Sequence, residues 1–324
     1  MKDQPLFRPK QAREAVFSNL IENWDEAKNL PGELRDKLKK EAPLEINAKI
    51  FETGDNAQKA LIVLADGEKI ETVLMRHQDG RNTVCVSSQV GCALGCAFCA
   101  TGKIGFKRNL ADEEIVEQVL LWARRLKKEN KRVSNIVFMG MGEPFLNYEN
   151  VLSAIKILND KAGLNIGSRR ISLSTAGIVE GIKKLANEPF QVNLALSLHA
   201  PNDELRQEIM PIAQKYKLAE IFEALENYIE KTKRRVMLEY IMIKDMNDSD
   251  ACAKELVLLI KKMKRPLVFV NLILYNETGV FKSSSARRVK GFKGILEREG
   301  IEVSQRWRFG DDSAAACGQL AGEA

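Results

Sequence analysis

The stretch Gly91-Cys92-Ala93-Leu94-Gly95-Cys96-Ala97-Phe98-Cys99 places three cysteines within eight positions. Thiolates are soft ligands that favour zinc or iron–sulfur clusters over hard cations. A closed structural zinc site needs four ligands, and the next candidate, Cys85, lies seven residues upstream of Cys92. Three cysteines therefore suit a four-iron cluster with one iron left open for another ligand. The alternatives are an incomplete zinc knuckle or three small buried hydrophobic residues.

The spacing C-x3-C-x2-C, with Phe98 directly before the last cysteine, resembles the cluster loop of the radical S-adenosylmethionine (SAM) enzymes. The flanking segments sharpen this resemblance. Val86-Ser87-Ser88-Gln89-Val90-Gly91 and Gly105-Phe106-Lys107-Arg108-Asn109-Leu110 are similar to the RlmN/Cfr family of RNA adenine methyltransferases, and most of all to its RlmN branch. The resemblance implies a 4Fe–4S cluster held by Cys92, Cys96 and Cys99, with SAM bound to the open iron.

The bulk composition is that of an ordinary globular protein with room for one large domain and a small appendage, because 45% of the 324 residues are hydrophobic and 29% charged. The N-terminus carries Lys2, Asp3 and Gln4 instead of an apolar run, and no stretch approaches the roughly 18 apolar residues of a membrane span. We expect a cytoplasmic monomer without membrane association. Six cysteines, three of them clustered, fit a reducing compartment with metal chemistry.

The net charge of +6 is mildly basic, and the cations gather in runs. These runs lie at residues 124–132, 231–235, 261–265 and 287–293. Several such runs on one side of the fold would form a face for RNA phosphates. Solvated ends of amphipathic helices explain each single run equally well.

Residues 1–52 read as a small helical domain, with helices predicted over 12–24 and 33–40 around Leu30-Pro31-Gly32. The resemblance implies that this domain engages RNA; the alternative is a helical cap with no substrate role. Residues 53–82 read as a β-hairpin linker, because Asp66-Gly67 joins two apolar runs at 59–64 and 69–75. Glu71, on the second run, reads by itself as an exposed glutamate on a half-buried strand.

Residues 83–304 alternate between strand and helix patterns, which indicates parallel βα units in an α/β fold. The predicted strands lie at 83–87, 134–139, 170–174, 191–198, 235–243 and 267–274, and the predicted helices at 112–128, 149–159, 177–187, 217–230, 249–263 and 284–299. The resemblance makes this a partial (βα)6, TIM-like barrel. The cluster loop follows the first strand, so we expect it at the carboxyl end of the barrel, where such folds place their chemistry.

Polar residues and glycines recur where these strands end. Gly142 follows the second strand, and Glu143 offers a carboxylate for an ammonium group. The resemblance assigns SAM binding to these two residues and to Ser174, Ser197, Leu198, His199 and Asn276. Without the resemblance, each would be an N-cap or a hydrogen-bonded loop residue.

The tail, residues 305–324, contains Cys317 between small residues and Gly318, which predicts an accessible thiol. By contrast, Cys252 lies in a helical pattern and reads as a core thiol. The segment Ala315-Ala316-Cys317-Gly318-Gln319-Leu320 resembles the family's tail with its methyl-bearing cysteine. Cys85 falls where the family has its second catalytic thiol, and Glu71 where it has a proton acceptor.

The resemblance implies methylation of adenine C2 in 23S rRNA, at the peptidyl transferase centre, and in tRNA. Cys317 would take a methyl group from one SAM. Cleavage of a second SAM would give a 5′-deoxyadenosyl radical that activates this methyl for addition to adenine. Glu71 would take the ring proton, and Cys85 would release the protein–RNA adduct as a disulfide forms. Flavodoxin or ferredoxin would supply electrons.

Two other functions stay open at this point. One is a Cfr-like C8-methyltransferase, against which Gly142-Glu143-Pro144 favours C2. The other is a non-catalytic iron–sulfur RNA-binding protein, which would have no need of Cys85 or Cys317.

Overall fold

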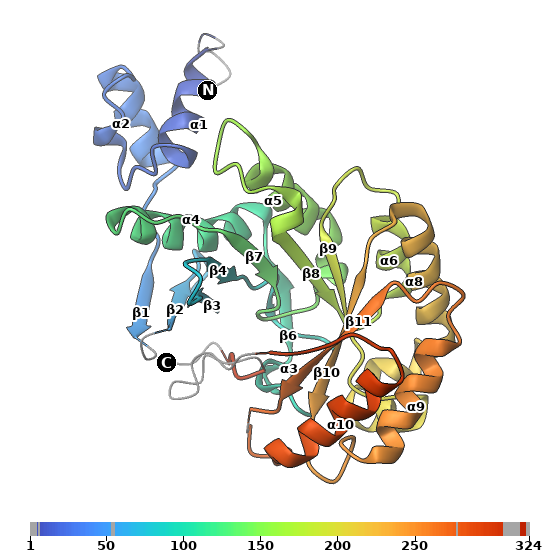
Figure 1. The fold of residues 1–324 in the computed structure, drawn as a ribbon. Coiled ribbons are helices and arrows are strands. Elements are labelled where there is room, and N and C mark those ends of the chain that lie inside the picture. The colour runs from blue at the N-terminus through green and yellow to red at the C-terminus, as the bar shows by residue number, and fades with distance from the viewer. Residues whose placement is uncertain (1–4, 6, 53–55, 277, 307–317, 322–324) are drawn as a thin grey trace.

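A ten-stranded sheet runs through the molecule in this computed structural model, which describes residues 5, 7–52, 56–276, 278–306 and 318–321 (Figure 1). In sheet order the strands are β1 (Ala48–Glu52), β2 (Ala57–Val63), β3 (Lys69–Arg76), β4 (Asn82–Cys85), β7 (Asn135–Phe138), β8 (Ile171–Thr175), β9 (Asn193–Ser197), β10 (Val236–Met242), β11 (Val268–Leu274) and β12 (Val303–Gln305). Neighbours from β1 to β4 are antiparallel, and from β4 to β12 they are parallel.

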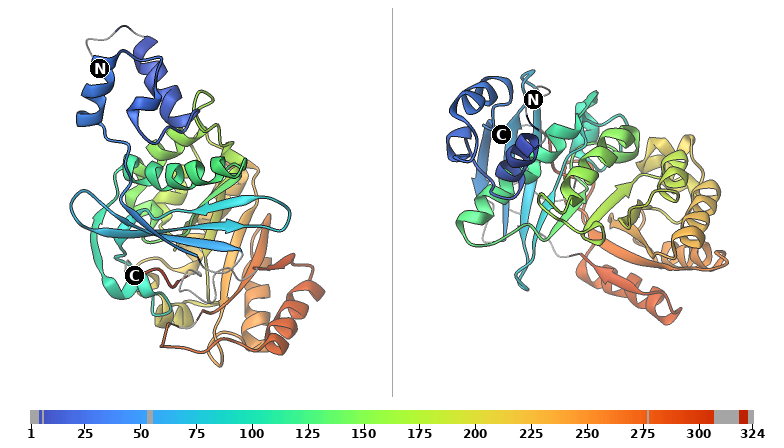
Figure 2. Two further views of the ribbon diagram at one scale, coloured as in Figure 1. Left: turned by 90° about the vertical axis from the view of Figure 1, so that its left-hand side faces the viewer. Right: turned by 90° about the horizontal axis from the view of Figure 1, so that it is seen from above.

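The parallel part is the expected partial barrel. All six predicted strands are present as β4 and β7 to β11, and the six predicted helices cover the outside of the curved sheet (Figures 1 and 2). These helices are α4 (Asp112–Lys128), α5 (Tyr148–Asn159), α6 (Val179–Leu185), α8 (Leu218–Thr232), α9 (Asp250–Lys261) and α10 (Ala286–Arg298). The apolar residues of α4 recur at helical spacing, and the side chains at four of these positions are fully buried: Ile115, Val119, Trp122 and Leu126. The apolar face seen in the sequence is therefore the face that packs against the core.

Short elements around the barrel escaped the sequence-based prediction. They are β5 (Gln89–Gly91) with its partner β6 (Phe106–Asn109), α3 (Ala100–Ile104), α7 (Asp203–Ile209), β1 and β12, and the 3₁₀ turns η2 (Pro144–Asn147), η3 (Ser168–Arg170) and η4 (Pro211–Gln214). Segments of three to seven residues are too short to show a periodicity of their own. No helix of the described part is long and apolar enough to cross a membrane.

The N-terminal helices are α1 (Phe7–Phe17) and α2 (Gly32–Glu41), with the 3₁₀ turn η1 (Trp24–Glu26) between them. The second predicted helix is confirmed, but the bounds 12–24 of the first are wrong. The chain leaves α1 after Phe17, because Leu20 adopts a left-handed backbone with φ of 51° and Asn23 caps a separate turn through Asp25 N–H. Trp24 is then buried, and its Nε1–H donates to Ala42 O at 2.7 Å.

The predicted hairpin is confirmed, since Gly67 at φ 84° turns the chain between β2 and β3. Its strands belong to the main sheet, and both of their faces are covered. Trp122 of α4 donates to Thr72 Oγ1 at 3.1 Å on one face, while Glu71 on the other face pairs with Lys59 at 2.8 Å. The expectation of an exposed Glu71 is therefore wrong: its side chain is 0% exposed.

Candidate active site at the carboxyl ends of the barrel strands

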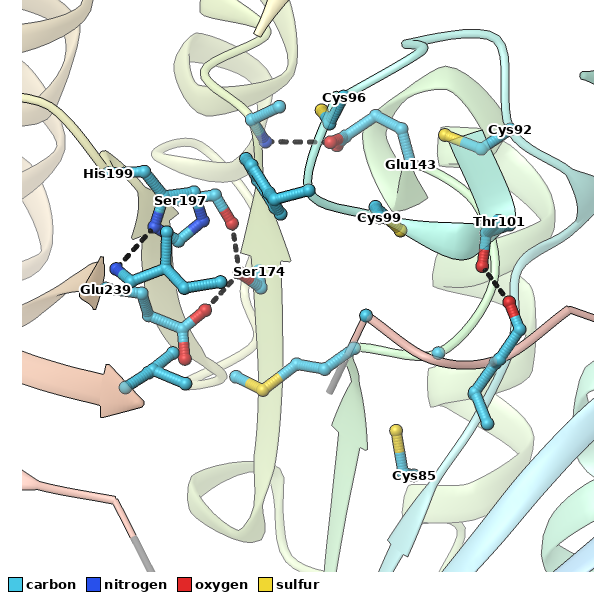
Figure 3. A pocket seen from close by; sticks show the side chains of 18 of the residues that line it. Cys85, Cys92, Cys96, Cys99, Thr101, Glu143, Ser174, Ser197, His199 and Glu239 are labelled. Carbon is cyan, nitrogen blue, oxygen red and sulfur yellow. Dashed lines mark hydrogen bonds between the residues drawn. The ribbon is translucent and has the colours of Figure 1, made fainter. Parts of the chain in front are cut away.

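One cavity opens where the parallel strands end, and it encloses about 1400 Å³ of space, part of it open to solvent (Figure 3). Its lining includes the expected site residues Cys85, Cys92, Cys96, Cys99, Gly142, Glu143, Ser174, Ser197, His199 and Asn276. Segments that are far apart in the sequence thus meet in one place, as the order of strands predicts.

The cluster loop is held at its base by β5 and β6, which flank it. Cys92 N–H donates to Gly105 O at 2.9 Å. Gly91 has φ of 73°, and a Cβ at this position would lie 1.8 Å from Gly105 O. Only glycine fits here, so Gly91 fixes the close approach of the two ends of the loop.

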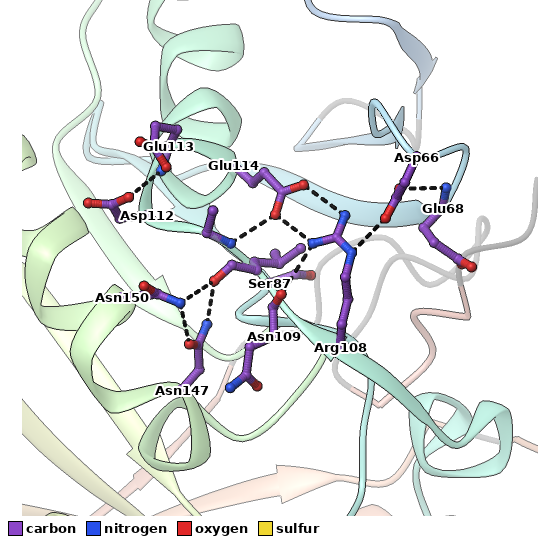
Figure 4. A network of polar contacts seen from close by, with 12 residues as sticks. Asp66, Glu68, Ser87, Arg108, Asn109, Asp112, Glu113, Glu114, Asn147 and Asn150 are labelled. Atoms are coloured by element: carbon purple, nitrogen blue, oxygen red, sulfur yellow. Dashed lines mark hydrogen bonds and ion pairs between the residues drawn. The ribbon is translucent and has the colours of Figure 1, made fainter.

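Arg108, on β6, fastens the exit of the loop to two other parts of the chain (Figure 4). Its guanidinium donates two parallel hydrogen bonds to Glu114 of α4, each 2.8 Å long, and one to Asp66 of the hairpin turn at 2.6 Å. The hydrogen bonds that Arg108 donates to Glu114 and Asp66 raise the pKa of Arg108. Behind this clamp, Asn147 donates to Ser88 O and Leu110 O at 2.8 Å. The loop therefore projects from a rigid base.

The three thiols of the loop line the cavity and are partly buried. Burial raises the pKa of Cys92 to about 12, and burial together with the nearby Cys99 and Cys92 sulfurs raises the pKa of Cys96. A cationic centre that binds Cys92 and Cys96 would favour their thiolate forms and offset this burial. In the part of the chain that is described, no three His, Cys, Asp or Glu side chains are placed to ligate a single ion. Three soft donors on a cavity wall fit a multi-iron cluster, whose thiolates bind different iron atoms.

Glu143 is 3% exposed and reaches the cavity from the turn after β7. Its carboxylate accepts the N–H groups of Ala176 at 2.8 Å and Phe145 at 3.0 Å. Burial raises its pKa to about 7, and these two backbone hydrogen bonds oppose the rise. A carboxylate held this way ionises readily when an ammonium group arrives beside it.

The glycines before Glu143 serve packing. A Cβ at Gly140 would lie 2.7 Å from Val86 O, and one at Gly142, whose φ is 97°, would lie 2.5 Å from the Gln89 Cβ. The turn therefore packs directly on the segment that enters the cluster loop. The close approach of the turn to the Val86 backbone and to Gln89 explains both glycines.

Ser174 and Ser197 end β8 and β9 side by side, with their hydroxyl oxygens 3.3 Å apart. Ser174 Oγ–H donates to Glu239 of β10 at 2.9 Å, and Arg306 pairs with the other oxygen of that carboxylate at 3.2 Å. Glu239 and Arg306 both line the cavity. The sequence analysis missed both; the only signal for Glu239 was a carboxylate inside an apolar strand, where a charge needs partners.

His199 adopts a left-handed backbone at φ 60°, which places its buried ring on the cavity wall. Ile241 N–H donates to its Nδ1 at 3.1 Å, so the neutral ring carries its proton on Nε2. Burial lowers the pKa of His199 to about 3, which keeps the ring neutral and a hydrogen-bond donor at physiological pH. Asn247, a third residue that was not predicted from the sequence, is fully buried and donates to His199 O at 2.8 Å.

Two expected residues do not line the cavity. The Leu198 side chain is fully buried, its N–H donates to Glu239 O, and its carbonyl accepts from Arg206. Glu71 lies under the C-terminal segment, since Ala321 N–H donates to its Oε2 at 2.8 Å. Cys85 ends β4 and is 7% exposed at the cavity wall (Figure 3). Cys317 lies outside the described residues.

Comparison with known proteins agrees with this geometry. Residues 86–255 match the family model of the radical SAM superfamily. The chain is 47% identical over 320 residues to the probable dual-specificity RNA methyltransferase RlmN of Dictyoglomus thermophilum, which covers 98% of this chain and 91% of the relative. The protein belongs to the RlmN family of radical SAM methyltransferases. The predicted family and fold are confirmed.

Other RlmN relatives and a crystal structure extend the match. The relative of the same name from Thermotoga neapolitana is 45% identical, over 97% of this chain and 91% of its own length. A crystal structure of a radical SAM methyltransferase from Sphaerobacter thermophilus superposes with a TM-score of 0.96 at 44% identity, covering 99% of this chain and 95% of that one. The similarity therefore spans the helical N-terminal part, the hairpin and the barrel.

The described end of the tail packs against the cluster loop of this RlmN-family protein. Ala100 N–H donates to Gly318 O at 2.7 Å, and Thr101 Oγ–H donates to Leu320 O at 2.6 Å. The Leu320 side chain is 5% exposed and joins the main core. The residue directly after Cys317 is thus anchored beside Cys99, on the cavity wall.

The basic runs are partly neutralised on the surface. Lys128 pairs with Glu22 at 2.6 Å, Arg235 with Glu302 at 2.7 Å, and Lys261 with Glu299 at 2.5 Å. Pairing with carboxylates of the same chain weakens the attraction of these cations for phosphate.

Proposed function

We propose that this protein methylates C2 of adenine in RNA, with 23S rRNA at the peptidyl transferase centre and tRNA as substrates. The relatives named RlmN, 41–47% identical over nearly the whole chain, support RNA as the substrate. One observation carries the proposal: the three cluster cysteines, Cys85 and the anchored residue after Cys317 surround the same cavity. A protein that only bound RNA would need neither of the two additional thiols.

The chain offers a separate set of residues for each cofactor. Cys92, Cys96 and Cys99 would hold a 4Fe–4S cluster. Glu143 would bind the ammonium group of SAM, and the SAM ribose and adenine would lie among the groups contributed by Ser174, Ser197, His199 and Asn276. When bound, the cluster and SAM supply the one-electron chemistry that an electrophilic sp² carbon requires. A flavodoxin or ferredoxin in the cytoplasm would provide the electron.

The residues outside the cofactor set have three tasks. Cys317 takes the methyl group from one of two SAM molecules used per turnover and carries it to adenine. Glu71 accepts the ring proton, which requires Ala321 N–H to leave its Oε2 first. Cys85 then bonds to the Cys317 sulfur as the bond between that sulfur and the product carbon breaks, which leaves a Cys85–Cys317 disulfide.

The test is anaerobic turnover of the protein after cluster reconstitution, with SAM, a reductant and unmodified ribosomal RNA or tRNA. The RNA is digested to nucleosides and analysed by mass spectrometry. The proposal expects 2-methyladenosine. Formation of 8-methyladenosine would instead show a Cfr-like C8-methyltransferase. If the cluster is intact but neither methylated product nor SAM cleavage is detected, the protein is better explained as a non-catalytic iron–sulfur RNA-binding protein.

Three cysteine variants test the roles of the thiols. Cys317→Ala should abolish product, because no side chain then carries the methyl group. Cys85→Ala should trap a covalent protein–RNA adduct, visible as a shifted gel band. Cys252→Ala is the matched control: this thiol is partly buried on α9, outside the cavity lining, and its loss should leave turnover unchanged. Normal product from Cys317→Ala would exclude the mechanism.

A further inference from the structure

Arg206, on the short helix α7, is a buried cation that no step of the proposed reaction uses. Its side chain is 0% exposed and does not line the cavity. Nη2 donates to Ala176 O at 2.6 Å and to Ser197 O at 3.3 Å, and Nε donates to Leu198 O at 3.1 Å. These carbonyls belong to the ends of β8 and β9, so the guanidinium ties together two loops that form the cavity wall.

The positive charge of Arg206 is poorly compensated within the protein. No carboxylate among the described residues forms an ion pair with it, and Nη1 is buried without a hydrogen-bond partner. Burial lowers the pKa of Arg206 to about 10, so it stays protonated at neutral pH. A buried charge without an ion-pair partner is unfavourable, and an anion bound nearby would stabilise it.

The cluster loop lies against the same helix. Ala97 N–H donates to Ile209 O, at the end of α7, at 3.0 Å. Ile209 and Leu205 pack in one apolar cluster with Cys92, Cys96 and Phe98. Arg206 donates to Ala176 O, and Ala176 packs in this same apolar cluster. The helix that carries Arg206, and one of the residues that Arg206 holds, therefore pack against the loop whose cysteines would become thiolates when a cluster binds.

We propose that Arg206 is the buried counter-charge of the iron–sulfur cluster and a positioning residue for its loop. This inference rests on the cluster of the proposed function. A cluster with three thiolates is anionic and gains a further negative charge on reduction, so a nearby cation stabilises the reduced form most. Arg206 thus makes the cluster easier to reduce. The same guanidinium also holds the two loops that follow β8 and β9, through their carbonyl groups.

The experiment is a redox titration of the reconstituted cluster, monitored by electron paramagnetic resonance. Arg206→Met removes the charge, Arg206→Gln removes it but keeps a donor for the carbonyls, and Arg206→Lys keeps it. We expect a more negative midpoint potential in the Met and Gln variants and a potential near that of the wild type in the Lys variant. Asp203→Asn, which removes an acid that attracts Arg206, should shift the potential in the positive direction.

Arg124→Met is the matched control. Arg124 is 8% exposed, forms no ion pair among the described residues, and donates to Leu44 O at 2.8 Å; neither residue lines the cavity. Its loss should reduce stability without changing the potential. Unchanged potentials in Arg206→Gln and Asp203→Asn, with a full cluster and an active wild type, would overturn the inference alone. A wild type that binds no cluster would instead overturn the proposed function.

Discussion

Two glutamates, Glu143 and Glu71, are buried near the cavity, and the negative charge of each carboxylate is stabilised in a different way. Glu143 accepts two backbone N–H groups and forms no ion pair within the described chain. Glu71 forms an ion pair with Lys59 at 2.8 Å and accepts one backbone N–H from Ala321. Both side chains are almost fully removed from solvent, at 3% and 0% exposure.

This difference decides how readily each carboxylate can bind a cationic ligand. Backbone N–H groups supply only partial charges, so Glu143 keeps the capacity to bind a full positive charge from a ligand. Lys59 already provides that charge for Glu71, so Glu71 is less suited to a second cation. The same residue type therefore occupies two different electrostatic settings, one without a cation and one already paired with a lysine.

The largest expected effect on stability follows from removing the lysine of the Lys59–Glu71 ion pair. Lys59→Met leaves the Glu71 carboxylate buried without a counter-charge and should lower the free energy of unfolding by about 3–5 kcal/mol. Chemical denaturation of the apo protein measures this. Lys107→Met, which removes an exposed partner of Glu68, is the control and should cost less than about 1 kcal/mol. Equal losses in the two variants would show that Glu71 is not charged in the folded protein.

The second prediction concerns Glu143 and pH. Its pKa is about 7 in the folded protein against 4.5 for the ordinary group, because burial disfavours the charge. Between these pH values the folded state holds a proton that the unfolded state has released, so the free energy of unfolding falls as pH rises. Over this interval the wild type should lose roughly 3 kcal/mol more than Glu143→Gln. Chemical denaturation of the two apo proteins at several pH values measures this. If the difference between their free energies of unfolding does not change with pH, the raised pKa of Glu143 is wrong.

The smallest effect concerns the turn that carries Glu143. Gly142→Ala adds a Cβ 2.5 Å from the Gln89 Cβ and strains a backbone at φ 97°. Gly67→Ala imposes similar strain at φ 84° with nothing within 4 Å. We expect a loss of about 1 kcal/mol for Gly67→Ala from the backbone alone. Gly142→Ala should lose about 1–3 kcal/mol more from overpacking. Thermal unfolding of both variants measures the difference, and equal shifts would mean that the turn can move away from Gln89.

Much of the fold followed from local pattern. The six barrel strands, six helices and the Asp66-Gly67 turn carry periodicities or turn residues that are visible in the sequence, and each is present. The error at the first helix arose because Leu20 and Asn23 end it locally, against an apolar spacing that continues to Trp24. The short helix α7 carried no periodicity of its own, and Arg206 was missed with it.

By itself, the sequence determined the family, through the three-cysteine motif at residues 92–99 and its flanks, and the succession of barrel strands. Motif spacing and hydrophobic periodicity are properties of neighbouring residues, so the sequence contains both. Only the tertiary structure decided which polar groups are buried and what compensates them. Glu71 read as exposed, Glu239 went unnoticed and Arg206 gave no signal, since each depends on segments distant in the chain: Lys59 and Ala321, Ser174 and Arg306, or the ends of β8 and β9. Burial and charge compensation are sums over such contacts, and a one-dimensional pattern does not contain them.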